Sequence, residues 1–264
     1  MAFHVVIPAR HASTRLPGKP LLDIGGKPMI QRVVEQAAAS GADEVLVATD
    51  DIRIAEAVQD PRERARGGIA VMTDAALPSG TDRVAAVARA RGWADDTIVV
   101  NVQGDEPFVP PSLIDQAAAL LASDPGAAIA TLATPIESLH EFLDPNVVKV
   151  VFADDGAALY FSRAPIPWSR DGASSGPGSQ TEFSRALRHV GLYAYRVGAL
   201  KRITAMAPST YENVEKLEQL RALQAGLRIT VALCAERPGP GIDTDADLQR
   251  ARSRAANEPG ARRP

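Results

Sequence analysis

Short runs of β-branched and other apolar residues alternate with alanine-rich segments through the first half of this 264-residue chain. Four of the runs predict strands, at 3–8, 44–49, 69–72 and 97–103. Three segments between them have helical period, at 28–41, 52–58 and 81–90. Because strand and helix take turns, the pattern favours a mostly parallel sheet flanked by helices. The strands are almost continuously apolar, which indicates a sheet buried on both faces.

From about residue 127 the pattern becomes rich in strands. Further strands are predicted at 127–135, 146–152, 157–161, 189–196 and 228–235, and helices at 213–224 and 245–254. We therefore expect one α/β unit over 1–255, with a strand-rich insertion at about 127–205 and a disordered tail at 256–264. The Gly/Ser-rich stretch at 171–181 is typical of a mobile surface loop.

Composition excludes several classes of protein. The 29 basic and 32 acidic residues give a net charge of −3, which lacks the positive field of a general nucleic-acid binder. The single cysteine, Cys234, excludes an internal disulfide and favours a reducing compartment. No apolar stretch approaches the roughly 20 residues that cross a bilayer. Since the amino terminus also lacks a signal-peptide pattern, we expect a cytoplasmic protein without membrane insertion.

The loop after the first predicted strand carries an unusual number of groups that bind anions. Arg10, Ser13, Arg15 and Lys19 all fall within it. In an open α/β sheet, ligands bind beyond the carboxyl ends of the strands, so these groups project into the expected binding crevice. The loop matches neither G-x-x-x-x-G-K-[ST] nor G-x-G-x-x-G, which argues against a P-loop NTPase and a dinucleotide oxidoreductase. A solvated basic loop with a Pro-Gly turn is the alternative.

Two acidic segments are candidates for a metal site. Asp105 and Glu106 follow the strand at 97–103, and Asp243 follows a Gly-Pro-Gly turn. Mg²⁺ is usually held by one or two carboxylates together with substrate phosphates, so an aspartate facing a basic loop is a natural ligand. The alternatives are that Asp105 caps a helix beginning near residue 111 and that the acidic cluster at 243–247 only caps the last helix.

Other polar residues stand at positions where a ligand could be held. Ser79 and Gly80 begin a predicted helix, where they could receive an anion or a nucleobase, although a simple capping box is equally consistent. Arg163, His189 and Tyr193 in the strand-rich segment could hydrogen-bond a polyol acid. His189 could equally be a core histidine whose hydrogen bonds are satisfied inside the protein.

Seven blocks together resemble one enzyme family in the same order along the chain. They lie at 10–21 (RHASTRLPGKPL), 79–83 (SGTDR), 99–107 (VVNVQGDEP), 147–151 (VVKVV), 160–168 (YFSRAPIPW), 189–196 (HVGLYAYR) and 217–221 (LEQLR). This is the CMP-KDO synthetase family, the 3-deoxy-manno-octulosonate cytidylyltransferases, and the similarity extends from about residue 3 to 250. It implies a nucleotide-diphospho-sugar transferase-like fold and Mg²⁺-dependent transfer of CMP from CTP to KDO, releasing pyrophosphate, for lipopolysaccharide synthesis. It also implies a homodimer formed through the strand-rich segment.

The resemblance assigns roles to individual residues. It places the triphosphate at Arg10, Ser13, Arg15 and Lys19, the cytosine near Ser79 and Gly80, and the metal at Asp105 and Asp243. Of these, Lys19, Arg15 and Asp105 would act in catalysis. Recognition of the sugar acid falls to Arg83, Gln103, Arg163, His189, Tyr193, Glu218 and Gln219.

Two other functions compete with this hypothesis. A cytidylyltransferase for another sugar acid, such as sialic acid, is disfavoured because those enzymes usually carry Gly-Ser-Lys-Gly in the first loop, where this chain has Ala-Ser-Thr-Arg-Leu-Pro at 12–17. A non-catalytic nucleotide-binding regulator on the same fold could lose its metal groups, whereas Lys19, Asp105 and Asp243 are all present here.

Overall fold

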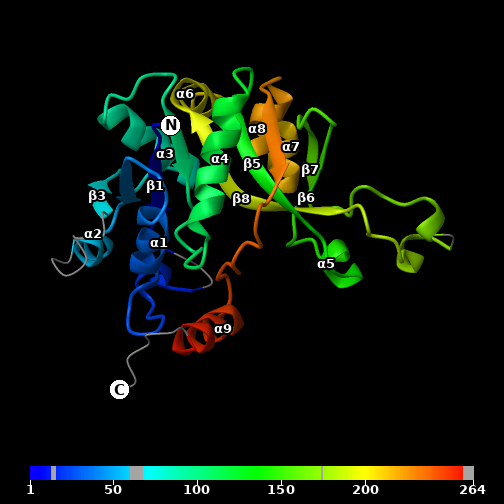
Figure 1. The fold of residues 1–264 in the computed structure, drawn as a ribbon, viewed down its shortest axis with the longest axis horizontal. Helices are drawn as coiled ribbons and strands as arrows, with labels where there is room; N and C mark the ends of the chain where they lie inside the picture. The colour runs from blue at the N-terminus through cyan, green and yellow to red at the C-terminus, as the bar shows by residue number, and fades with distance from the viewer. Residues whose placement is uncertain (13–15, 60–67, 174, 258–264) are drawn as a thin grey trace.

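The computed structural model describes residues 1–12, 16–59, 68–173 and 175–257, so the predicted site residues Ser13 and Arg15 lie outside the described residues. A mixed sheet in the order β3-β2-β1-β4-β8-β5-β9 forms the centre of the molecule (Figure 1). Its strands are β1 His4–Ala9, β2 Glu44–Thr49, β3 Gly68–Met72, β4 Ile98–Asn101, β5 Ile129–Pro135, β8 Leu187–Arg196 and β9 Ile229–Leu233. A hairpin of β6 Lys149–Phe152 and β7 Ala158–Ser162 joins it through β8.

Strand direction determines where a ligand can bind. β3, β2, β1 and β4 are mutually parallel, β8 is antiparallel to β4 and β5, and β9 is parallel to β5. Only β8 therefore opposes the other strands of this row, which confirms the expected mixed, mostly parallel sheet. The carboxyl ends of β1, β4, β5 and β9 consequently share one edge with the start of β8.

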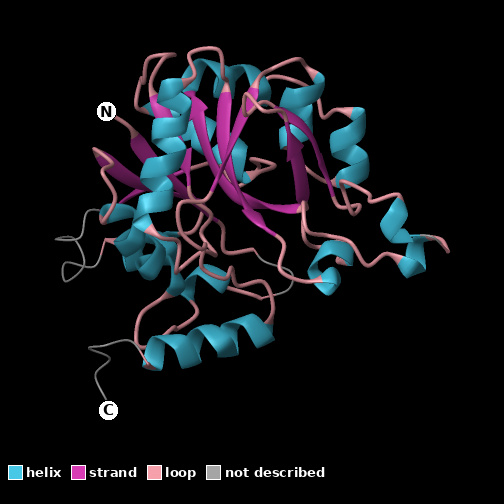
Figure 2. Ribbon diagram, turned by 45° about the vertical axis from the view of Figure 1, so that its right-hand side comes forward, coloured by secondary structure: helices cyan, strands magenta, loops and turns pink. Residues whose placement is uncertain are grey.

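Helices cover both faces of the sheet (Figure 2). Side chains of α1 Met29–Ala38, α2 Ile52–Val58 and α4 Pro111–Ser123 pack with the odd-numbered residues of β1, and α3 Gly80–Ala90, α6 Val197–Thr204 and α8 Gln219–Gln224 form a second core on the opposite face. This alternation of β1 between two cores is the period-two pattern of a buried strand. Among the described residues, no helix has the length and apolar composition needed to span a membrane.

The last helix returns the chain to the amino-terminal half of the protein. α9 Asp245–Ala256 begins in a capping box between Thr244 and Asp247. Its apolar stripe, including Leu248 and Ala251, packs with Met29 and with residues of the first loop. Residues 237–244 thus lead from β9 across the carboxyl edge of the sheet before α9 begins, which brings Asp243 to that edge.

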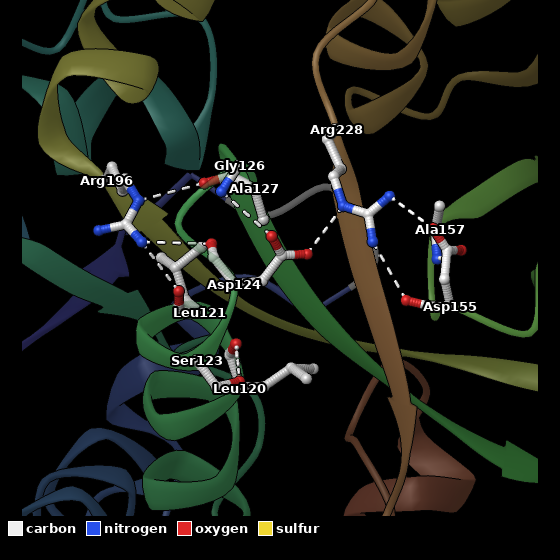
Figure 3. Close-up of polar contacts among 10 residues, drawn as sticks. All are labelled: Leu120, Leu121, Ser123, Asp124, Gly126, Ala127, Asp155, Ala157, Arg196 and Arg228. Carbon is white, nitrogen blue, oxygen red and sulfur yellow. Dashed lines mark hydrogen bonds and ion pairs between the residues drawn. The ribbon is translucent and has the colours of Figure 1, made fainter.

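Two arginines join the elements at the opposite, amino edge of the sheet (Figure 3). Arg228 Nε donates to Asp124 Oδ2 at 2.8 Å, and its NH1 donates to Asp155 Oδ2 at 3.0 Å. Arg196 NH2 donates to the carbonyl of Leu121 at 3.0 Å, near the end of α4. Cations at a helix carboxyl terminus bond its unpaired carbonyls, so this cluster ends α4 and ties it to β8, β9 and the β6–β7 turn.

The structure corrects two details predicted from the sequence. The single helix expected at 213–224 is two helices, α7 Thr210–Glu215 and α8, because Lys216 adopts a left-handed conformation with φ 55°. The stretch predicted to be a mobile surface loop at 171–181 contains two short 3₁₀ turns, Asp171–Ala173 and Pro177–Ser179, and its mobility stays a prediction.

The second correction concerns the strand-rich insertion. Strands β5 and β8 belong to the central sheet, so the excursion from the sheet is shorter than 127–205 and runs over 136–186. It comprises α5 Leu139–Leu143, the β6–β7 hairpin and an arm that extends away from the sheet in Figures 1 and 2. Of the tail predicted at 256–264, the first residue ends α9 and residues 258–264 lie outside the described residues.

Candidate active site

A cavity of about 340 Å³ lies beyond the carboxyl ends of β1 and β4, which we call the inner pocket. This is the edge at which open α/β sheets bind ligands. The sequence-predicted residues that line it are Arg10, Lys19, Ser79, Gly80, Arg83, Gln103, Asp105, Glu218 and Asp243. The structure therefore brings together groups from segments far apart in the chain.

A larger cavity of about 1210 Å³, the outer pocket, adjoins the inner one. The two share Gly80, Gln103, Glu218 and Asp243 on their walls. The outer pocket also contains the remaining predicted residues Arg163, His189, Tyr193 and Gln219. Every predicted site residue that the structure describes thus lines one pocket or the other.

The two candidate metal-binding aspartates meet at one lysine in the inner pocket. Lys19 Nζ donates to Asp105 Oδ2 at 2.6 Å and to Asp243 Oδ1 at 3.1 Å. Lys19 opens a short 3₁₀ turn after Gly18, which has φ 66°, a conformation that glycine adopts without steric cost. The two carboxylates thus already bind one positively charged group, the Lys19 ammonium. They could bind a metal cation in the same way.

Backbone contacts explain why the aspartates converge. The amide of Ile242 donates to the carbonyl of Asp105 at 3.0 Å, which places Asp243 beside Asp105. A Cβ on Gly104 would lie 2.9 Å from the carbonyl oxygen of Pro8, closer than real Cβ contacts come. Glycine at 104 therefore allows the segment after β4, which carries Asp105, to approach β1 closely.

A third carboxyl group lies beside this pair. Burial and the neighbouring charge of Asp105 raise the pKa of Glu106 to about 8. Glu106 also lines the outer pocket. The sequence placed Glu106 at the sheet edge but assigned it no role.

The sequence also allowed Asp105, Asp243 and Ser79 to act only as helix caps, and the structure gives a different answer for each of them. Helix α4 begins after Pro110 with no side-chain cap, so Asp105 does not cap it. Asp247, rather than Asp243, supplies the capping box of α9. Ser79 does cap α3, since its Oγ accepts from the amide of Asp82 at 3.2 Å, and it lines the inner pocket as well.

Arg83 lies in the inner pocket, whereas the sequence hypothesis associated it with the sugar. Its guanidinium is only 3% exposed and donates to Asp50 Oδ2 at 2.6 Å and to Thr73 Oγ1 at 2.7 Å. Asp50 immediately follows β2, at the same edge of the sheet. This buried ion pair fixes the inner wall, and a direct contact of Arg83 with a sugar carboxylate stays a prediction.

A β-bulge gathers aromatic side chains in the outer pocket. The pairing of β5 with β8 shifts between Thr131 and Leu132, which leaves Gly191 and Leu192 of β8 without opposite partners. In a regular strand, residues four apart are separated by about 13 Å. Here the rings of His189 and Tyr193 are 5.2 Å apart, so the bulge brings both into the same cavity.

Burial keeps these two side chains uncharged. It lowers the pKa of His189 to about 3 and raises the pKa of Tyr193 well above its ordinary value. His189 Nε2 hydrogen-bonds Thr131 Oγ1 at 2.9 Å. A neutral imidazole with this pKa does not act as a general base near pH 7, and it can still hydrogen-bond a ligand.

Arg163 is held in place by main-chain contacts on the far wall of the outer pocket. Its Nε donates to the carbonyl of Glu215 at 2.7 Å, and its NH1 donates to the carbonyl of Pro145 at 3.0 Å. Its own carbonyl accepts from Nζ of the fully buried Lys149 at 2.7 Å. These bonds fix the orientation of Arg163 toward the cavity that it lines.

The break between α7 and α8 positions the last two predicted residues. Lys216 takes up φ 55°, a strained conformation for a residue other than glycine. The chain then turns so that Glu218 and Gln219 line the outer pocket, with Glu218 Oε2 accepting from Thr81 Oγ1 at 2.6 Å. Strain that is concentrated at a ligand-facing turn is typical of functional sites.

Sequence reasoning missed several residues of the outer pocket. Asn101 and Arg188 line it, as do Lys216, Arg237 and Arg250. Period-two spacing could have found Asn101, because it lies two residues before Gln103 and so shares its side of the chain at the end of β4. The three residues beyond Arg188 have no comparable signal, since their approach depends on how distant loops fold.

A mixed sheet with a charged crevice at its carboxyl edge is the arrangement that the sequence predicted for a nucleotidyltransferase. A family model described as Cytidylyltransferase matches residues 4–229. The 3-deoxy-manno-octulosonate cytidylyltransferase of Thioalkalivibrio sulfidiphilus is 54% identical over 250 residues, covering 95% of this chain and 97% of the relative. That of Xanthomonas euvesicatoria is 55% identical over 255 residues, covering 97% of this chain and 96% of the relative.

Solved structures agree with these relatives. A structure of CMP:2-keto-3-deoxy-manno-octonic acid synthetase complexed with CTP superposes with a TM-score of 0.84 at 44% identity, covering 97% of this chain and 98% of that chain. A cytidylyltransferase from Leptospira borgpetersenii, at 17% identity and a TM-score of 0.61, shares the fold. The chain belongs to the cytidylyltransferase family, among the 3-deoxy-manno-octulosonate cytidylyltransferases.

The lowered pKa of His189 gives a direct test of the outer pocket. Because protonation would place a charge in a buried site, we expect the imidazole NMR signals of His189 to remain those of a neutral ring down to about pH 4. The loss of these signals in His189→Asn assigns them. A titration midpoint above about pH 5 would show that the ring is solvated and that this description of the pocket is wrong.

Proposed function

We propose that the inner pocket binds CTP, that the outer pocket binds KDO, and that their junction transfers CMP to the sugar acid with release of pyrophosphate. The activity itself is that of the family to which the chain belongs, with CMP-KDO serving lipopolysaccharide synthesis. The observation that supports this division is that Lys19, Asp105 and Asp243 converge in the inner pocket and that Asp243 also lines the outer pocket.

The basic groups of the inner pocket account for nucleotide binding in this proposal. Arg10 and Lys19 supply positive charge beside the expected triphosphate, which offsets the charge that develops on departing pyrophosphate. Ser79 and Gly80 at the amino end of α3 would lie near the cytosine. Ser13 and Arg15 are assigned to the triphosphate by the family resemblance alone.

The donor set at the junction fits Mg²⁺. Two carboxylates already converge on one ammonium nitrogen, and hard cations are commonly held by one or two carboxylates plus substrate phosphates. Among the residues that the structure describes, no group of three or more His, Cys, Asp or Glu side chains could hold a metal ion. Substrate phosphates and water would therefore have to complete the coordination of Mg²⁺ here. When bound by Asp105 and Asp243, Mg²⁺ would neutralise the α-phosphate and lower the pKa of the anomeric hydroxyl.

The residues of the outer pocket would orient the acceptor. Arg163 is pre-set by its main-chain bonds and offers a cation to the sugar carboxylate, while neutral His189 and Tyr193 offer hydrogen bonds to hydroxyls. Gln103 and Glu218 line both pockets, so they can contact the acceptor next to the nucleotide. Fixed donors and acceptors of this kind reduce the entropy that is lost when two substrates are aligned.

We also propose a cytoplasmic location. CTP is a cytoplasmic metabolite, and the single cysteine leaves no internal disulfide that would favour an oxidising compartment.

An assay of pyrophosphate release tests the activity. With CTP and Mg²⁺, we expect release to require KDO and to be much slower with sialic acid, because the outer pocket is built for a particular arrangement of hydroxyls. Activity with sialic acid alone would support the rival acceptor. Binding of CTP without release in the presence of either acceptor would instead favour a non-catalytic regulator.

Substitution of the junction aspartates tests their role. We expect Asp105→Asn and Asp243→Asn each to lower turnover by at least about a hundredfold, since a metal ligand supports several kcal/mol of transition-state stabilisation. The exposed Asp96 lies outside both pockets, so Asp96→Asn is the matched control. Chelation with EDTA should abolish turnover in the wild type and added Mg²⁺ should restore it. Near-normal turnover in either site variant would remove that aspartate from the metal site.

A homodimer formed through the excursion is the third part of the proposal. Leu159 and Trp168 in this segment are 60% and 41% exposed. Burial of such large apolar side chains against a second copy would remove apolar surface from water. We expect light scattering of the full chain to give twice the mass of 27.9 kDa, and Leu159→Asp to shift the protein toward the monomer. A monomeric wild type would contradict this assignment.

A further inference from the structure

Three buried side-chain atoms in the described part of the chain have no hydrogen-bond partner. They are Nδ1 of His4, Oδ1 of Asn101 and Nε2 of Gln219. His4 begins β1 at the amino edge of the sheet, where its ring stacks on Trp93 with centroids 4.3 Å apart. The other two atoms belong to residues that line the outer pocket. Two of the three unpartnered atoms therefore lie at a single cavity.

Such atoms lower stability, because each loses its hydrogen bonds to water on burial without gaining new ones. Asn101 is 2% exposed and Gln219 is 7% exposed, so little solvent reaches either side chain. The position of Asn101 would suit an apolar residue, since it ends a strand whose other residues are Ile98, Val99 and Val100. The packing of the strand therefore gives no reason for an amide side chain at position 101.

The surroundings of Asn101 contain the groups already assigned to the acceptor. It pairs with Tyr193 across β4 and β8, in register with that residue of the outer pocket. Gln219 approaches the same cavity from the amino end of α8. The free atom of Asn101 is an acceptor and that of Gln219 is a donor. A hydroxyl can satisfy either kind of group, and a polyhydroxylated ligand can satisfy both.

We propose that Asn101 is a further specificity-determining residue, whose side-chain oxygen accepts a hydrogen bond from a hydroxyl of the sugar acid while Gln219 donates to another oxygen of the same ligand. The inference rests on the proposed binding of KDO in the outer pocket. It predicts discrimination in favour of acceptors that carry the matching hydroxyl, because an analogue without it leaves the buried oxygen unpaired. Asn101 orients and selects the acceptor and takes no part in the chemical step.

The variant Asn101→Leu separates a ligand-binding role from a structural one. We expect kcat/KM for KDO to fall by roughly tenfold to a hundredfold, with KM for CTP changed by less than about twofold. The thermal midpoint should stay the same or rise, because an unsatisfied polar group has been removed from the interior. Asn213 is exposed on α7, so Asn213→Leu is the matched control and should leave the kinetics unchanged. A lower midpoint with unchanged discrimination between acceptors would overturn the proposal.

Analogues of KDO that each lack one hydroxyl provide the second measurement. The wild type should reject one analogue by roughly tenfold or more, and Asn101→Leu should use that analogue and KDO equally well. Should Asn101→Leu fail to fold, Asn101→Ala gives the same comparison, with CTP binding as the check of folding. Equal discrimination in the variant and the wild type would refute the role of Asn101. A wild type that releases no pyrophosphate with KDO would contradict the proposed function instead.

Discussion

One ammonium group joins three distant parts of the chain at the site. Lys19 comes from the loop after β1, Asp105 from the end of β4 and Asp243 from the segment before α9. Two carboxylates placed side by side repel each other. The positive charge of Lys19, which contacts both carboxylates, offsets this repulsion.

The rest of the structure holds this contact in place from both ends of the sheet. At the carboxyl edge, the close approach at Gly104 and the bond from Ile242 to Asp105 bring the carboxylates together. At the amino edge, Arg196 and Arg228 tie α4 to the central strands. The candidate site and these structural contacts therefore occupy opposite edges of the sheet, and close-packed buried strands connect them.

Much of this arrangement follows from local sequence patterns. The helix at 52–58 and the strand at 44–49 have the predicted bounds, because hydrophobic period and capping residues specify them locally. The break at Lys216 could not be predicted, since the apolar periodicity continues through it and only the tertiary turn imposes φ 55°.

The limits of sequence reasoning are similar within the site. The family resemblance predicted that Lys19, Asp105 and Asp243 share one site. The internal ion pair of Arg83 with Asp50 and the bulge between His189 and Tyr193 arise from packing and strand register, which residue types alone do not encode. The positions that resisted prediction are thus those where a long-range contact outweighs local preference.

The reversed direction of β8 has a consequence for how such enzymes can diversify. Strand β5 leaves the sheet at its carboxyl edge and β8 re-enters at the same edge, so residues 136–186 begin and end beside each other. A segment with adjacent ends can change in length or content without altering the order of the parallel strands. The contribution of this segment to the proposed acceptor site, which includes Arg163, can therefore change while the order of the parallel strands is kept.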